Sequence, residues 1–575
     1  MRRAWWILSL ILVPVPGALA QQFSRHVVVS QERFASEAGR DALRAGGNSI
    51  DAAIATAFAL AVTHPSAGNL GGGGFLVAYL PETKEIVTVD FRETAPAAST
   101  PTMYLDADGK TLPRHREGRG RPACPGRSAA SACAHRQWGS LPWAELVAPA
   151  WKLAREGFPV SETLARSLNA QLHPEGPRND VPEDLGPEAD FLAHFASSVK
   201  AYGKPDDTRW KAGDTIVQAD LAATLERIAR EGPDEFYRGK TAELIAADAR
   251  DHGGLITLDD LRNYKAYRRE PAHTTFRGHD VYGIGPAASG GIVTQLALNI
   301  LERYDLKADG PRSARTLHRV AEASKRAFFV RATEIADPGF VPVDVRRLTS
   351  KEFADRMAES IGEKATPSAA LAPFPVIGAE SNHTTHLSTM DGFGGAVALT
   401  YTLEEGYGSK YVVPGAGFLL NNEMGDFNLI PGRTDANGRI GTPANAIAPG
   451  KRMLSSQSPT LVLKDGKVRL VTGSPGGRTI PSTVLWVLLN VLEFGMGPAE
   501  AIQAPRTHHP WFPDAITLEG RSWDPAVIDD LKARGHAIRQ ATYQGDANSI
   551  VVDPASGAIH GVPDPRRRTE TAAGD

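Results

Sequence analysis

The apolar residues of this chain change their spacing along its length, from helical to strand-like and back. Helical spacing is found at 36–62, where Gly46 and Gly47 separate two predicted helices, and at 291–302, 317–334, 482–492 and 525–534. Strand-like runs lie at 75–80, 86–92, 383–390, 395–403, 417–423, 460–463 and 467–472. Helices, strands, strands and helices in this order predict a sheet sandwich covered by helices on both faces.

A hairpin predicted at 383–403 contains two threonines of interest. If its loop is the three residues after Asp391, then Asp391 lies opposite Gly395, and the same register places Thr384 opposite Thr402. A slip of one residue would turn Thr402 to the other face. From the hairpin alone, an ordinary Thr-rich strand is the simpler interpretation.

The first twenty residues have the pattern of a secretory signal. Arg2 and Arg3 precede a short apolar run, and small residues end at Ala20, which predicts a signal peptide of residues 1–20. No segment approaches the ~20 unbroken apolar residues of a membrane span, so we expect no membrane anchor. The net charge of -3, spread along 575 residues, argues against nucleic acid as a partner. We expect a periplasmic or secreted protein, built as two or three domains or as one large sandwich.

Neither a metal nor a cofactor is expected. Cys124 and Cys133 are too few for a four-ligand zinc site, and they are compatible with one disulfide or with two free thiols. His508 and His509 are neighbours on an extended stretch and would point apart. The four glycines at 71–74 lack a following Lys-Ser or Lys-Thr, so they do not predict a phosphate loop.

Seven short motifs together resemble the gamma-glutamyltransferase family, the glutathione hydrolases, over nearly the whole mature chain. They lie at 66–75, 90–96, 289–291, 380–386, 421–427, 454–456 and 473–477. Each one is weak, but their joint occurrence in this order is specific. The resemblance implies the αββα four-layer sandwich of N-terminal-nucleophile hydrolases, in the α/β (α+β) class. It also implies self-cleavage between His383 and Thr384, into a large subunit of residues 21–383 and a small subunit of residues 384–575.

By the same resemblance, Thr384 is the nucleophile. Its hydroxyl needs a base, and the α-amino group that cleavage frees on the same residue can serve, because it titrates near ~8. Thr402 matches the residue that holds and polarises this hydroxyl in the family. Gly476 and Gly477 match the backbone donors to the oxyanion. From the residues alone, this Pro-Gly-Gly run is more simply a turn.

The resemblance also implies a subsite for the zwitterionic head of a γ-glutamyl group. Arg92, Ser455 and Ser456 match the ligands of the α-carboxylate, which an Arg fork suits. Glu423 and Asp426 match the acceptors of the α-ammonium. Outside these motifs, a surface ion pair and a solvated acidic loop would be the ordinary interpretations.

Three features depart from the family pattern. Glu404 stands where many members have Asn, so one carboxyl of the subsite is expected to have a raised pKa or to lie back behind water. The segment 114–136 is basic, poor in large apolar residues and sharply bounded, which suggests a local frameshift in the gene. If the segment is real, we expect it not to form the buried helix of the family and to lower stability near Arg92. A predicted lid loop at 432–443 has no aromatic residue, which predicts a more open site.

We therefore expect a gamma-glutamyl hydrolase and transferase that acts on glutathione and related compounds through an ester on Thr384. Water or the amine of an amino acid or peptide accepts the acyl group. A cephalosporin or glutaryl acylase is the nearest alternative, and retention of Arg92, Glu423 and Asp426 argues against it. A second alternative is an inactive, uncut homologue that serves as an exported binding protein. The acceptor preference, the physiological donor and the oligomeric state stay open.

Overall fold

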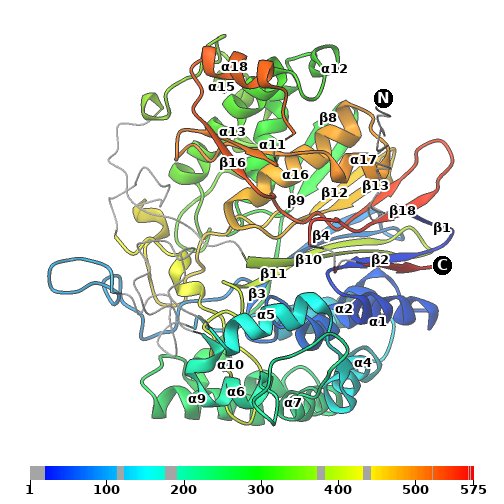
Figure 1. The fold of residues 1–575 in the computed structure, drawn as a ribbon, viewed down its shortest axis with the longest axis vertical. Coiled ribbons are helices and arrows are strands. Elements are labelled where there is room, and N and C mark those ends of the chain that lie inside the picture. The colour runs from blue at the N-terminus through cyan, green and yellow to red at the C-terminus, as the bar shows by residue number, and fades with distance from the viewer. Residues whose placement is uncertain are drawn as a thin grey trace, which may run out of the picture.

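The computed structural model describes residues 20–112, 122–174, 191–371, 383–430, 442–520, 522–567, 569 and 571–575. The predicted signal peptide, up to residue 19, and residues 432–441 of the predicted lid loop lie outside the described residues. Two seven-stranded sheets are stacked in the middle of the molecule, and helices cover the outer face of each (Figure 1).

All strand pairs within these two sheets are antiparallel. The first sheet runs β19 (Thr571–Gly574), β2 (Val27–Ser30), β10 (His383–Met390), β11 (Ala396–Glu404), β3 (Gly73–Leu80), β4 (Glu85–Asp90) and β7 (Tyr267–Arg269). The second runs β1 (Gln21–Phe23), β18 (Ile559–Val562), β17 (Ser549–Val552), β13 (Lys467–Thr472), β12 (Thr460–Lys464), β9 (His279–Gly283) and β8 (Ala272–Phe276).

Side-chain alternation along the strands divides the core into three layers. On β3, Phe75 and Val77 point between the sheets, where they pack with residues of the second sheet such as Leu461. Leu76, one step along, points outward into the first helical layer. Val462 likewise points away from the sheet interface, into the second helical layer. The four-layer sandwich predicted from the sequence is therefore confirmed.

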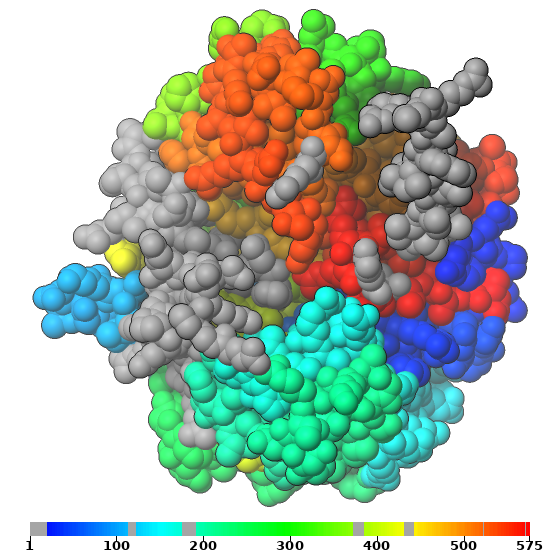
Figure 2. All heavy atoms as spheres, viewed as in Figure 1, coloured from blue at the N-terminus to red at the C-terminus, as the bar shows by residue number. Residues whose placement is uncertain are grey.

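The helices divide between the two outer layers. The first layer contains α1 (Arg33–Arg44), α2 (Ser49–Thr63), α4 (Trp143–Glu156) and α7 (Ala219–Glu231), and the second contains α11 (Gly290–Leu301), α13 (Ala314–Glu334) and α16 (Ile480–Leu488). Peripheral helices include α3 (Arg127–Trp138), α5 (Glu162–Leu172), α6 (Ala196–Tyr202), α9 (Lys240–Asp251), α15 (Lys351–Ala358), α17 (Pro498–Gln503) and α18 (Pro525–Ala533). In Figure 2, the green and orange segments of the second layer, distant in sequence, form one continuous surface at the top. Among the described residues, no helix is both long and apolar enough to cross a bilayer.

Most predicted elements are present, but one predicted strand is absent. The run 417–423 is not a strand: Leu419 and Leu420 make only isolated bridges, and the 3₁₀ helix η6 (Glu423–Asp426) follows directly. The Ala- and Pro-containing stretch 363–371 is held in place at buried Ser368, whose N–H donates to Asp514 Oδ2 at 2.7 Å. The residues that follow, 372–382, lie outside the described residues.

The prediction that segment 114–136 forms no buried helix was wrong, because α3 begins within it at Arg127 and is largely buried. Residues 114–121 of the segment lie outside the described residues. Its inward face carries Ala130 and Ala134, and small side chains allow close packing while alanine favours the helix. Buried Arg127 lies between two rings, with its Cζ 5.2 Å from the centroid of Phe58 and 5.1 Å from that of Tyr401. Both cysteines are free thiols.

Gly126, at the start of α3, provides a test of this packing. A Cβ there would lie 2.0 Å from Phe91 O and 2.2 Å from Tyr264 Oη, so Gly126→Ala is expected to destabilise the fold by about 2 kcal/mol or more in urea unfolding. Gly362→Ala is the matched control, since its Cβ meets no described atom within 4 Å, and its effect should stay within about 0.5 kcal/mol. Equal effects of the two substitutions would contradict the observed packing of α3.

Candidate active site

One small cavity of about 30 Å³ collects nine of the ten predicted catalytic and binding residues. These nine are Arg92, Thr384, Thr402, Glu404, Glu423, Asp426, Ser455, Ser456 and Gly477. The tenth, Gly476, precedes Gly477 in the chain. A volume of about 30 Å³ has room for a water molecule but not for a whole substrate. Segments that are far apart in the sequence therefore converge at the adjoining ends of β10 and β11.

The hairpin of β10 and β11 has the predicted register, with one local departure. Pairs run from Thr385 opposite Tyr401 to Met390 opposite Ala396, and the strands close through the predicted three-residue loop. At Thr384 the register shifts by one residue, which forms a bulge. Thr384 is therefore not a ladder partner of Thr402, although both side chains are buried and line the cavity.

The end of β11 is shaped by a backbone turn at Glu404. This residue has a φ of 80°, in the left-handed region that few residues other than glycine adopt. Its N–H donates to Thr402 Oγ1 at 2.7 Å. The Glu404 side chain lines the same cavity as Thr402.

Arg92 is the electrostatic centre of the cavity. It is only 1% exposed, and its Nη1 lies 2.7 Å from Glu423 Oε2 and 3.4 Å from Glu93 Oε2, while its Nη2 pairs with Asp426. Burial raises the pKa of Glu423 well above its usual range, although Arg92 opposes this shift. A raised carboxyl pKa is the direction expected from crowding these acids around one subsite.

Burial also raises the pKa of Glu93 to about 7, against the influence of Arg92. Between pH ~4.3 and 7 the folded chain keeps a proton that the unfolded chain has released, so this group lowers stability as pH rises. The free energy of unfolding of Glu93→Gln, relative to that of the parent chain, is therefore expected to increase from pH 5 to pH 8 by up to about 3 kcal/mol. Urea unfolding at several pH values, in chains that also carry Thr384→Ala and stay in one piece, measures this. If the free energies of unfolding of the two chains change with pH in parallel, the raised pKa of Glu93 is contradicted.

The segment before α3 supports the acidic side of the cavity. Asn421 donates through Nδ2 to Gly71 O at 2.7 Å and to Ala123 O at 2.9 Å. Its Oδ1 accepts from the N–H groups of Ala123 and Glu423, at 3.0 and 3.1 Å. The segment expected to weaken this region instead helps to fix the position of Glu423.

The two serines lie on a turn that is held from outside the cavity. Ser455 O accepts from both the N–H and the hydroxyl of Ser289, each at 2.7 Å. Ser455 Oγ accepts from Gln457 N at 3.2 Å. The hydroxyl of Ser456 is buried and has no hydrogen-bond partner among the described residues. It is placed to bond a ligand in the cavity.

Gly476 and Gly477 need their lack of a side chain. Their φ values are 131° and 53°, and a Cβ on Gly476 would lie 2.5 Å from Thr479 Oγ1. They lead into the 3₁₀ turn η8 (Gly477–Thr479) and then α16, so their N–H groups lie at the positive end of a helix. This position suits the binding of negative charge.

Sequence reasoning missed four residues that line the cavity. They are Arg331, Leu454, Gln457 and Ile480. Arg331 is the most consequential, because it adds a second buried cation. Helical spacing predicted α13 correctly, but it does not distinguish Arg331 from the other basic residues of that helix.

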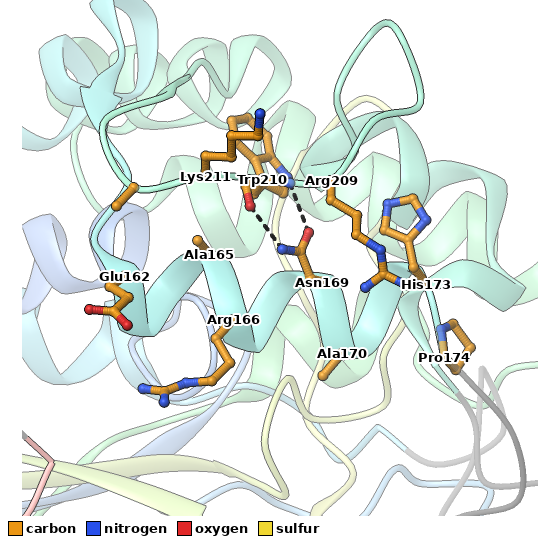
Figure 3. A pocket seen from close by; sticks show the side chains of 11 residues that line it. Glu162, Ala165, Arg166, Asn169, Ala170, His173, Pro174, Arg209, Trp210 and Lys211 are labelled. Atoms are coloured by element: carbon orange, nitrogen blue, oxygen red, sulfur yellow. Dashed lines mark hydrogen bonds between the residues drawn. The ribbon is translucent and has the colours of Figure 1, made fainter.

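Two other features lie away from this cavity. Within the described ranges, no three His, Cys, Asp or Glu side chains gather as metal ligands would, and His508 Nδ1 instead lies 2.8 Å from Ser482 Oγ. A more open hollow of about 680 Å³ lies along α5, where Asn169 and Trp210 exchange hydrogen bonds of 2.9 and 2.8 Å (Figure 3). It contains none of the predicted site residues.

This four-layer architecture, with a threonine at the start of a central strand in the cavity, is that of an N-terminal-nucleophile hydrolase. A sequence model described as gamma-glutamyltranspeptidase matches residues 35–574. The "Glutathione hydrolase proenzyme" of Escherichia coli (strain K12) is 42% identical over 554 residues, which cover 95% of this chain and 91% of that protein. The chain belongs to the gamma-glutamyltranspeptidase family.

Two solved structures are similar to this chain. A cephalosporin acylase from Bacillus halodurans has a TM-score of 0.83 and 28% identity, with 99% of each chain covered. The gamma-glutamyltranspeptidase of Helicobacter pylori has a TM-score of 0.55 and 35% identity, covering 62% of this chain and 96% of that chain. The fold is shared with both activities, so the choice between them depends on the cavity.

Proposed function

We propose that this chain is the precursor of a gamma-glutamyl hydrolase and transferase that acts on glutathione and other γ-glutamyl compounds. One observation carries the proposal: a buried threonine pair shares a cavity with Arg92, Glu423 and Asp426. The threonines supply acyl-transfer chemistry, and the charged residues match both charges of an amino-acid head.

Maturation would begin at Thr384 itself. Its hydroxyl attacks the carbonyl of His383, the peptide bond between them breaks, and the nitrogen becomes the free α-amine of Thr384. Water then opens the resulting ester. The products are a large subunit of residues 21–383 and a small subunit of residues 384–575. The H. pylori chain supports this division, because nearly all of it matches only 62% of the present chain.

In the mature enzyme, the same hydroxyl would attack the γ-carbonyl of the donor. The α-amine of Thr384 takes the hydroxyl proton and passes it to the leaving amine as the carbon–nitrogen bond breaks. Thr402 holds the hydroxyl, and the N–H groups of Gly476 and Gly477 stabilise the oxyanion. Water or an amine then takes the γ-glutamyl group from the ester and restores Thr384.

The proposed subsite already brings together groups of both charges. Arg92 is paired with Glu423 and Asp426, so its charge is neutralised within the protein. A bound γ-glutamyl group would bring its carboxylate to Arg92, Ser455 and Ser456. Its ammonium would go to Glu404, Glu423 and Asp426, which exchanges protein ion pairs for ion pairs with the ligand. A glutaryl group has no ammonium, so it would draw on Arg92 without offering these acids a cation in exchange.

Hydrolysis of two anilides tests this proposal against the acylase alternative. The cut protein is expected to favour γ-glutamyl over glutaryl p-nitroanilide by at least about 100-fold in kcat/KM, because the glutaryl compound has no ammonium to bond the acids of the proposed subsite. A preference for the glutaryl compound would make the protein an acylase. A well-folded chain that stays in one piece would support the exported binding protein. Export itself, to the periplasm or beyond, is proposed from the signal-like residues 1–20.

A further inference from the structure

Arg331 reaches the cavity from α13, in the outer helical layer. Its side chain is 1% exposed, and it lines the cavity with the predicted site residues. The Nε of Arg331 donates to Ser289 Oγ at 3.0 Å. A guanidinium is more weakly hydrated than an ammonium, which suits it to buried sites. Arg331 therefore places a positive charge beside the proposed subsite.

Ser289 connects Arg331 to the turn that carries Ser455 and Ser456. Its hydroxyl and its N–H both donate to Ser455 O, each at 2.7 Å. Ser455 N in turn donates to Ala287 O at 3.1 Å. The backbone of Ser455 is therefore held on both of its polar groups, and the unpartnered hydroxyl of Ser456 follows it directly.

The excess of acidic side chains in the cavity also favours a second cation. Three carboxylates line it, those of Glu404, Glu423 and Asp426, and Arg92 offsets only one of them. Arg331 reduces the imbalance from two negative charges to one if all three acids are ionised. A less negative cavity repels the α-carboxylate of an incoming zwitterion less strongly.

We infer that Arg331 is a positioning residue for the α-carboxylate of the γ-glutamyl group, acting through Ser289 on the turn of Ser455 and Ser456. This inference rests on the proposed function. It assigns to Arg331 a part in substrate binding and in the requirement for an α-carboxylate. It leaves the chemistry at Thr384 unchanged.

The test compares two anilides that differ only in the α-carboxylate. These are γ-glutamyl p-nitroanilide and 4-aminobutyryl p-nitroanilide, which keeps the amine. Arg331→Gln is expected to raise KM for the γ-glutamyl compound about 30-fold, the scale of a charge-assisted hydrogen bond, and to change kcat less than threefold. On the 4-aminobutyryl compound, kcat/KM should change less than threefold.

Two further variants separate positioning from general support of the fold. Ser289→Ala keeps the cation but removes the hydroxyl, and it should raise KM for the γ-glutamyl compound about fivefold. Arg346→Gln, whose side chain is 90% exposed, is the charge-matched control and should match the wild type. If Arg331→Gln does not mature, Ser289→Ala decides the question.

A fall in kcat with unchanged KM, or an equal loss on both anilides, would overturn the inference. Arg331 would then support the fold or the chemistry rather than the carboxylate. A cut wild type that fails to hydrolyse the γ-glutamyl anilide is a different result. It would remove the proposed function before any variant is compared.

Discussion

Thr384→Ala is expected to remain a single uncut chain and to lose γ-glutamyl hydrolysis by at least about 10⁴-fold. The methyl group cannot form the ester with the His383 carbonyl that leads to cleavage. It also cannot form the ester with substrate. A denaturing gel, together with the mass of the smaller polypeptide from the wild type, measures the first effect, and the γ-glutamyl anilide measures the second.

Thr389→Ala is the matched control for this prediction. It makes the same chemical change on the same strand, at a buried threonine whose hydroxyl donates to Ser49 O at 2.8 Å. We expect it to be cut normally and to lose about 1 kcal/mol of stability. If Thr384→Ala still split at the same bond, the assignment of the nucleophile would be wrong.

The site hairpin indicates how far periodicity alone can predict. Strand alternation and loop length were sufficient for the register from Asp391 back to Thr385, because a slip would turn every buried side chain outward. The bulge at Thr384 was not predictable in this way. It coincides with the left-handed backbone of Glu404, which the sequence does not mark with a glycine.

Side-chain size was a poor guide at α3. The segment lacks large apolar residues, yet Ala130 and Ala134 bury well because small side chains let the helix approach its neighbours closely. Arg127 would ordinarily signal an exposed face, but two aromatic rings accept its guanidinium in the core. Such a contact depends on residues distant in sequence, so local patterns could not reveal it.

The prediction of a strand at 417–423 was wrong for a related reason. Its apolar residues are buried, as the pattern indicated, but Asn421 takes the place of a strand partner and bonds Gly71 and Ala123 through its side chain. The motifs led to nine of the residues that line the cavity, because each of these lies in a short run that resembles the family. Arg331 lies in none of these motifs and reaches the cavity only because α13 packs beside it.

Arg92→Gln is expected to damage both stability and binding. It leaves Glu93, Glu423 and Asp426 without the cation that contacts all three, and breaking a buried pair in this way costs about 3–5 kcal/mol. It also removes the guanidinium proposed to bind the α-carboxylate, so kcat/KM on the γ-glutamyl anilide should fall by at least about 10³-fold. Arg92→Lys keeps the charge without the planar fork and should be intermediate.

An exposed ion pair provides the comparison for the stability effect. Arg303 and Asp355 pair at 2.8 Å with side chains 45% and 53% exposed, and Arg303→Gln should cost less than about 1 kcal/mol. Urea unfolding of these variants, each in the uncut Thr384→Ala chain, measures both losses. A similar small loss for Arg92→Gln would mean that the buried acids are already protonated and do not need the cation.

The double variant Arg92→Gln, Glu423→Gln separates the two roles of Arg92. Removing the nearest carboxylate together with its cation takes away most of the uncompensated charge, so stability should recover by about 2 kcal/mol relative to Arg92→Gln alone. Activity should not recover, because the proposed subsite has then lost a ligand for each charge of the γ-glutamyl head. Recovery of both would mean that Arg92 serves the fold and that another group binds the carboxylate. Recovery of stability alone is the result that the geometry of the cavity predicts.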